Sequence, residues 1–160
     1  GLAFLLLSCA ENNPPTPPPI PTVVPGQITV IEATAPEAPA GMVNGAVYLT
    51  LQNGTDQPVH LLSATTAVAA QLSFHETTDD NGIIRMRPQP DGFVMGPGES
   101  LVLAQAGKHL MLENLVAPLV AGAQFTLTLV FADADPMTIL IPVSTRGEVP
   151  MDHSKMDHNK

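Results

Sequence analysis

Short runs of alternating apolar and polar residues recur along the chain from Gly26 onward. The alternation is clear in Tyr48-Leu49-Thr50-Leu51 and in Phe125-Thr126-Leu127-Thr128-Leu129. A period of two is typical of a β-strand with one buried face and one face in water. Turn signals such as Asn53-Gly54 and Asn81-Gly82 separate the runs. The pattern predicts strands over residues 28–33, 46–52, 59–64, 71–76, 83–87, 101–104, 109–113, 125–132 and 137–143.

Many short strands without a long helical period predict an all-β fold. Strands and turns at this near-regular spacing favour an antiparallel β-sandwich or barrel. We expect one departure, a helical turn over residues 65–70. The predicted domain covers residues 26–146, which is ample for a hydrophobic core.

The start of the chain has a different pattern. Leu2 to Leu7 are all apolar, but a bilayer-spanning helix needs about 20 such residues. Residues 1–9 therefore fit the end of a signal peptide. Leu6-Leu7-Ser8-Cys9 resembles the bacterial lipobox, in which the cysteine carries a lipid; a secretory signal with a chance cysteine is the alternative. Both interpretations predict an extracytoplasmic protein, in the periplasm or outer cell envelope, and the first predicts a membrane tether on Cys9.

Seven prolines lie between positions 10 and 25. Proline cannot donate the backbone hydrogen bonds of a helix or sheet, so this stretch predicts a semi-rigid polyproline II spacer, with a simply disordered N-terminal segment as the alternative. At roughly 3 Å per residue, it would hold a domain about 45 Å from a surface.

The composition limits which partners and which kinds of metal site the chain can have. The 160 residues are 44% hydrophobic and 13% charged, with a formal charge of −9, which argues against nucleic acid as a partner because that requires a basic footprint. A single cysteine excludes an intramolecular disulfide and a thiolate metal cluster. Against it stand seven methionines and five histidines. These thioether and imidazole side chains are the candidates for a functional site.

Two predicted strands present such side chains on one face. Alternation places His109 and Met111 together and turns Leu110 and Leu112 toward the core. In the same way Phe74 and His75 take opposite faces of their strand, so that His75 points outward. The pattern alone leaves open whether these residues bind a metal, because a methionine in a strand is most often core filler. Met42 and Met137 are interpreted as packing or surface residues, and Met95 as the one spare methionine that could stand close to the site.

Four blocks together resemble a known family. They are Gly45–Asn53, Leu72-Ser73-Phe74-His75-Glu76-Thr77, Gly82-Ile83-Ile84-Arg85-Met86-Arg87-Pro88 and Gly107-Lys108-His109-Leu110-Met111-Leu112. They look like the periplasmic Cu(A) copper chaperone family, PCu(A)C, whose pattern is His, ten residues, Met, about twenty-one residues, His, one residue, Met. Here ten residues separate His75 from Met86, and twenty-two separate Met86 from His109. The additional residue falls in the region of residues 91–107, where loops tolerate insertion.

The resemblance implies a cupredoxin-like β-sandwich that binds one Cu(I) through His75, Met86, His109 and Met111. Thioether and imidazole are ligands that soft Cu(I) accepts. A site without thiolate should release copper to a thiolate-bearing acceptor, which suits a carrier. By resemblance that acceptor is the Cu(A) subunit of cytochrome c oxidase, or another copper acceptor.

The last residues, 147–160, form a second candidate metal region. The tripeptide Met-Asp-His occurs twice within it, and short His-rich tracts are compositional signals for metal binding. The predicted tail is flexible. Its methionines favour Cu(I) and its histidines could take Cu(II); a solvated polar tail is the alternative. The candidate tail ligands are Met151, His153, Met156 and His158.

Three functions follow from these patterns. The first is an extracytoplasmic, lipid-tethered copper chaperone. The second is a copper-buffering or resistance lipoprotein without a dedicated client, and the third is a metal-free β-sandwich surface module. We expect no enzyme, because no Ser/His/Asp set has a supporting local motif and no glycine-rich phosphate loop precedes a helix.

Overall fold

The computed structural model describes residues 25–146, and the expectations for residues 1–24 and 147–160 lie outside this range. Ten strands follow one another without an intervening helix in the described residues, which confirms the all-β prediction. Nowhere in this range does a helix reach the length and hydropathy needed to cross a bilayer. The strands are β1 (Ile28–Pro36), β2 (Gly45–Asn53), β3 (Val59–Thr66), β4 (Ala69–Asp80), β5 (Ile83–Pro88), β6 (Phe93–Met95), β7 (Ser100–Leu103), β8 (Lys108–Leu115), β9 (Gln124–Phe131) and β10 (Met137–Ser144).

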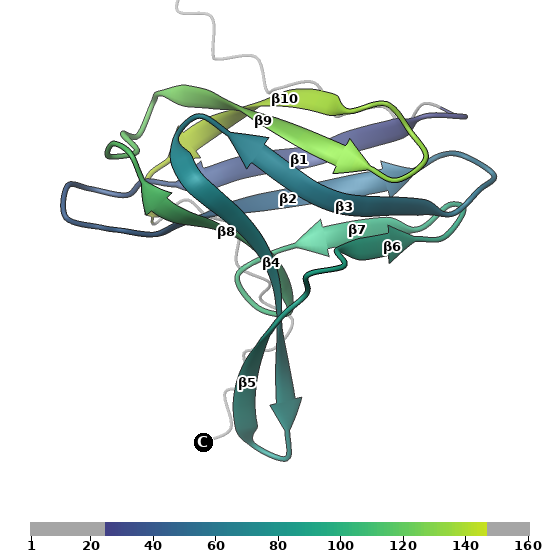
Figure 1. The fold of residues 1–160 in the computed structure, drawn as a ribbon, viewed down its shortest axis with the longest axis horizontal. Helices are drawn as coiled ribbons and strands as arrows, with labels where there is room; N and C mark the ends of the chain where they lie inside the picture. The colour runs from purple at the N-terminus through teal and green to yellow at the C-terminus, as the bar shows by residue number, and fades with distance from the viewer. Residues whose placement is uncertain (1–24, 147–160) are drawn as a thin grey trace, which may run out of the picture.

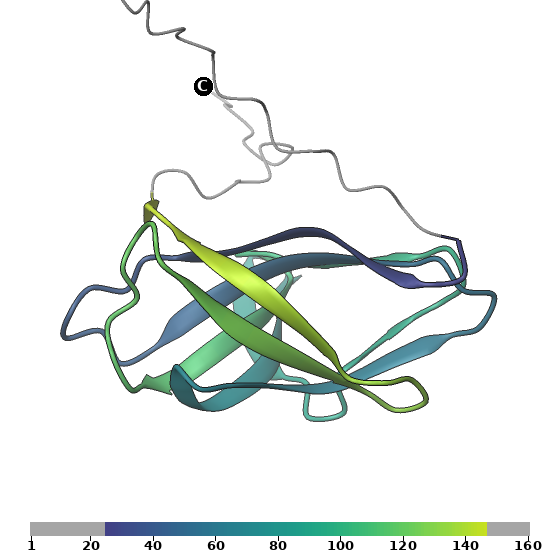
Figure 2. The ribbon, with the colours of Figure 1, turned by 90° about the horizontal axis from the view of Figure 1, so that it is seen from above.

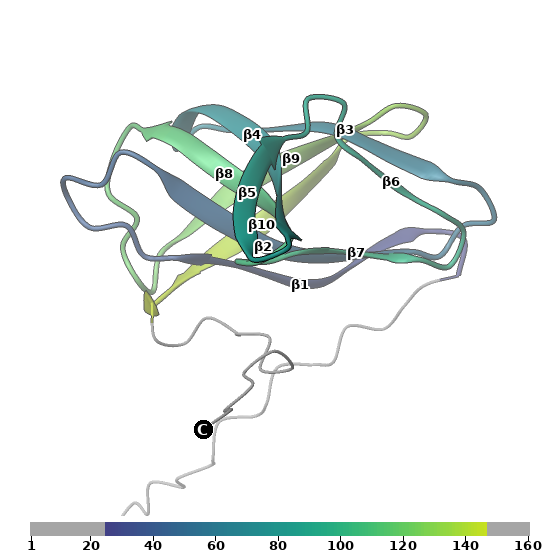
Figure 3. The same ribbon diagram turned by 90° about the horizontal axis from the view of Figure 1, so that it is seen from below.

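The strands form one sheet that folds back on itself. Its order is β5-β4-β8-β2-β1-β10-β9-β3-β6, and β7 adds to β2. The sheet does not close, so the sandwich rather than the barrel is observed. Figure 2 shows β9 and β10 as a neighbouring pair that runs obliquely across β1 and β2. Figure 3 shows β1, β2 and β7 in one layer and β3, β6 and β9 in the facing layer.

Alternating side chains fill the space between the layers. Val47, Leu49 and Leu51 of β2 are at most 1% exposed, and they belong to one core cluster with the fully buried Leu127 and Leu129 of β9. Burial of one such side chain contributes about 1.5–3 kcal/mol relative to exposure. The period of two seen in the sequence therefore corresponds to an inner face that packs and an outer face that stays free for other chemistry.

Three details differ from the sequence prediction. Residues 65–70 are not a helical turn: Thr66 ends β3, where it pairs with Leu127, and Ala69 begins β4. The β-branched threonines favour the strand, and the Thr66 hydroxyl accepts a hydrogen bond from the Val68 amide in the tight connection. The three-residue strand β6 was not predicted. One strand pair, β1 with β10, is parallel rather than antiparallel.

The β4–β5 hairpin projects away from the sandwich (Figure 1). Its turn places Asn81 and Gly82 at φ values of 57° and 87°, and Asn-Gly is the sequence that tolerates two positive φ angles in a row. The Gly82 amide also donates to Asp79 Oδ1 at 2.7 Å. All six residues of β5 are exposed, so the ladder to β4, rather than core packing, holds this strand.

Candidate metal centre

Strands β4 and β8 bring the two predicted histidines together. In the antiparallel ladder His75 is directly opposite His109, and Ser73 is opposite Met111. Residues opposite each other in such a pair share one face of the sheet. The two imidazole rings are stacked, with centroids 5.6 Å apart and planes inclined by 14°. The sheet therefore fixes three of the four predicted ligands on one surface.

Met86 reaches the same face from β5. It pairs with Thr77, which lies two residues beyond His75 and so points to the same side. Its side chain is 54% exposed. Strand pairing thus unites four residues that are spread over 37 positions of the sequence.

An open pocket of ≈ 340 Å³ lies on this face. Met86, His109 and Met111 all line it, whereas His75 adjoins it through its stacked ring. His109 differs from expectation: it lies on the outer face of β8 but is only 8% exposed, because the His75 ring and the pocket walls cover it. The remaining lining residues are Pro36, Glu37, Ala38, Met42, Asn44, Gly45, Ala46, Tyr48 and Arg146.

The hydrogen bonds of His109 determine which of its nitrogens is available. Its Nδ1 lies 3.0 Å from the Gly107 carbonyl oxygen. A carbonyl only accepts, so Nδ1 carries the proton and the neutral ring keeps its lone pair on Nε2. A backbone partner of this kind commonly orients a metal-binding histidine.

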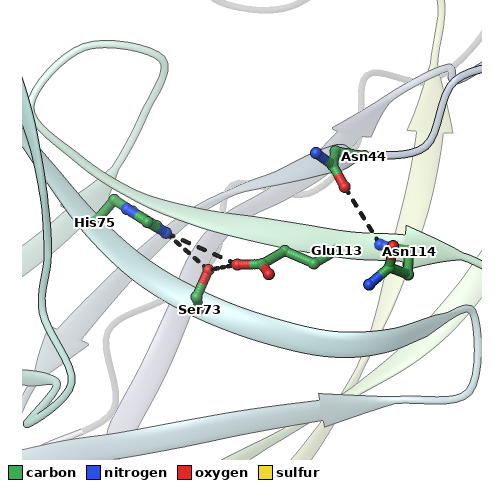
Figure 4. A network of polar contacts seen from close by, with 5 residues as sticks. All are labelled: Asn44, Ser73, His75, Glu113 and Asn114. Carbon is green, nitrogen blue, oxygen red and sulfur yellow. Dashed lines mark hydrogen bonds and ion pairs between the residues drawn. The ribbon is translucent and has the colours of Figure 1, made fainter.

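A polar network determines the tautomer of His75 (Figure 4). The Ser73 hydroxyl donates to the Glu113 carboxylate, and the same hydroxyl oxygen lies 2.8 Å from His75 Nε2. The single hydroxyl proton is used on Glu113, so Nε2–H must donate to Ser73. The neutral ring then carries its lone pair on Nδ1, a buried atom with no hydrogen-bond partner. Unpaired buried polar atoms are rare, and a soft cation would satisfy this one.

The donor set suits copper in its reduced state. Each imidazole offers one lone pair, and the thioethers of Met86 and Met111 lie on the same face of the sheet. Both ligand types are soft enough for Cu(I). Within residues 25–146, no group of three or more His, Cys, Asp or Glu side chains is arranged to hold a metal ion. The candidate centre therefore combines nitrogen with methionine sulfur.

Tyr48 and Arg146 form another wall of the pocket. Burial raises the pKa of Tyr48, and the nearby Arg146 guanidinium partly offsets this. The tyrosine thus stays a neutral hydroxyl at physiological pH, and Arg146 is the positive charge at this wall.

Several predicted residues lie outside the described range: Cys9 and the tail residues Met151, His153, Met156 and His158. Other residues of the pocket region were not predicted. Ser73 and Glu113 could have been found, because each is two residues from a candidate ligand and therefore shares its face. Met42 could not, because it comes from the loop between β1 and β2.

Comparison with known proteins agrees with this geometry. Residues 28–143 match the family described as "Putative lipoprotein LpqE-like". The chain belongs to the LpqE-like family. Over 116 residues, which are 72% of this chain and 69% of the relative, it is 34% identical to "Putative lipoprotein Lxx21020" of Leifsonia xyli subsp. xyli. The range that matches the family includes the four sequence blocks that resemble PCu(A)C.

Solved structures confirm the resemblance in the fold. The LpqE-like chain matches the copper-bound PCuAC domain from PmoF2 with a TM-score of 0.64 and 21% identity, over 77% of this chain and 97% of that domain. It also matches the Cu(I) form of DR1885 from Deinococcus radiodurans with a TM-score of 0.60 and 30% identity. This match covers 71% of this chain and 76% of DR1885. Its structural neighbours are thus copper-binding PCuAC domains.

Substitution of Glu113 by Gln tests the tautomer of His75. An amide can donate as well as accept, so the residue at 113 would no longer compel the Ser73 hydroxyl to donate away from His75. The hydroxyl proton would then be free to turn to His75 Nε2, and the lone pair on Nδ1 would be lost. We expect Cu(I) affinity to fall about 10–100-fold, as for other partners that orient metal ligands. Competition with a Cu(I) chelator measures the affinity, and ¹⁵N chemical shifts report the His75 tautomer.

Glu32→Gln is the matched control, because it removes the same charge from an exposed position of β1. It should leave both readouts unchanged. An E113Q protein with unaltered affinity and unaltered His75 shifts would contradict the assignment of Nδ1.

Proposed function

We propose that this protein is an extracytoplasmic copper chaperone, which binds one Cu(I) ion through His75, Met86, His109 and Met111. The observation that carries the proposal is the pair of lone pairs on His75 Nδ1 and His109 Nε2, on the face of the sheet that also carries Met86 and Met111. The 30% identity to DR1885, whose solved form holds Cu(I), supports the choice of metal.

The proposed site favours transfer over storage. It contains neutral nitrogen and thioether donors and no thiolate, so an acceptor with cysteine ligands can take the ion. Met86 lies on an exposed strand, where an incoming ligand can replace it first. We therefore propose delivery to a thiolate-bearing acceptor, the Cu(A) subunit of cytochrome c oxidase. No catalytic step is part of this function.

The same proposal includes a membrane tether and a second metal region. A lipid on Cys9 and the linker of residues 10–25 would hold the domain near a membrane, as the lipoprotein names of its relatives support. Met151, His153, Met156 and His158 would collect Cu(I) or Cu(II) near the domain. The last described residue, Arg146, lines the pocket, so this tail is joined to the chain at the site.

A transfer experiment tests the function. Chain loaded with one equivalent of Cu(I) is mixed anaerobically with the apo Cu(A) domain, the two proteins are separated, and copper in each is measured. We expect most of the copper on the acceptor, because thiolate binds Cu(I) more tightly than thioether does. Copper that stays on the chain, together with several ions bound per molecule in a separate titration with excess Cu(I), would instead indicate the buffering lipoprotein.

A further inference from the structure

A third methionine lines the pocket that holds the proposed copper ligands. Met42 comes from the loop between β1 and β2, and its side chain stands at the same hollow as Met86, His109 and Met111. It is 39% exposed, whereas His109 is 8% exposed. The pocket thus has two exposed thioethers, Met42 and Met86, in addition to the ligands on β8.

Arg146 holds the sulfur of Met42. Its Nη2 donates to Met42 Sδ at 2.8 Å, and the salt bridges of the described residues do not include this guanidinium. A thioether is a weak acceptor, and arginine ordinarily pairs with carboxylates. The contact therefore fixes the position of a flexible side chain at the pocket while leaving its sulfur only weakly engaged.

We propose that Met42 is a fifth soft donor of this pocket, to which Cu(I) binds transiently as it moves between solvent or acceptor and the ligands on β8. Arg146 is the positioning residue that keeps the Met42 sulfur at the pocket. This inference rests on the proposed function, because it assumes that Met86, His109 and Met111 hold the ion. It adds a thioether that the spacing of the histidines and methionines does not reveal.

Methionine-methyl NMR on the full chain tests the contact directly. The probe is Ag(I), a soft monovalent cation that does not undergo redox chemistry under these conditions, added to ¹³C-methyl-methionine protein. We expect the Met42 methyl signal to shift together with those of Met86 and Met111. Met95, which is buried in the core, and Met137 on β10 serve as internal references. Their methyl signals should not shift.

The outcomes separate the two claims. If the Met86 and Met111 signals move while Met42 stays, Met42 is not a donor and this inference is wrong. If none of the three moves, the proposed function itself fails at its site.

Exchange kinetics give an independent measure. Met42→Leu keeps the approximate size of the side chain and removes the sulfur, so we expect removal of Cu(I) by a chelator to slow about fivefold, which corresponds to about 1 kcal/mol. The equilibrium affinity should change by less than about threefold, because the other four donors remain. Met137→Leu is the matched control and should exchange at the wild-type rate.

Arg146→Gln tests positioning through Met42. We expect it to slow exchange in the wild-type background but to add nothing further to Met42→Leu, because both act on one contact. Slowing that is additive in the double variant would show that Arg146 acts without Met42. A Met42→Leu protein that exchanges at the wild-type rate would also overturn the proposal.

Discussion

A His109→Ala variant is expected to lose at least about a hundredfold in Cu(I) affinity while remaining folded. His109 is the most buried of the proposed ligands, and its Nδ1–H bond to Gly107 aims the lone pair of Nε2. Loss of a partner that merely orients a ligand typically costs 10–100-fold in metal affinity, so loss of a ligand should cost more. Anaerobic competition with a colorimetric Cu(I) chelator measures the change.

His60→Ala is the matched control for this variant. His60 lies on β3, contacts the Asp91 carbonyl oxygen and does not line the pocket. The Cu(I) affinity of the H60A protein should equal that of the wild type. An H109A protein that binds Cu(I) as tightly as H60A would show that the pocket is not the metal site.

The largest expected loss of stability follows replacement of Asn53 by Ala. Asn53 is fully buried at the end of β2, and its Nδ2 donates to the carbonyl oxygens of Gln57, Met95 and Gly96. Its Oδ1 accepts from the Thr55 amide at 3.0 Å and from the Thr55 hydroxyl. One side chain thus joins β2, the following turn and the loop after β6.

Alanine at this position removes one buried hydrogen bond, to the Met95 carbonyl oxygen, and four partly buried ones. A buried polar group left without a partner costs about 1–3 kcal/mol. We expect the free energy of unfolding to fall by about 3 kcal/mol or more, measured by urea denaturation. Asn44→Ala is the control, since Asn44 is exposed and makes one bond of 3.3 Å to the Asn114 amide; it should change stability by less than about 0.5 kcal/mol. Equal unfolding midpoints for the two variants would refute the structural role of Asn53.

Most of the strands could be predicted because burial in this fold follows the period of two. In β8, Leu110 and Leu112 are fully buried on the inner face, as the sequence pattern indicates. Strand β6 escaped prediction because Phe93–Met95 is too short to show a period. The parallel pairing of β1 with β10 joins the two ends of the domain, and such long-range pairing leaves no local sequence signal.

The candidate site was partly predictable for the same reason. Alternation placed His109 beside Met111, and the family pattern added His75 and Met86. Which nitrogen of each ring is free could not be predicted, because it depends on contacts that only the fold creates. For His75 these are with Ser73 and through it Glu113, and for His109 the contact is with the Gly107 carbonyl oxygen. The position of Met42 depends on a loop and on Arg146, 104 residues away in the sequence.

The central claim is that copper is held in this domain without any thiol. Two versions of the full chain test it, both with Leu or Asn in place of the tail residues Met151, His153, Met156 and His158. One keeps the core ligands, and the other also carries Ala at His75, Met86, His109 and Met111. In an anaerobic Cu(I) competition titration, we predict that the first retains one tightly bound ion and the second none. Equal retention of Cu(I) by the two proteins would contradict the claim.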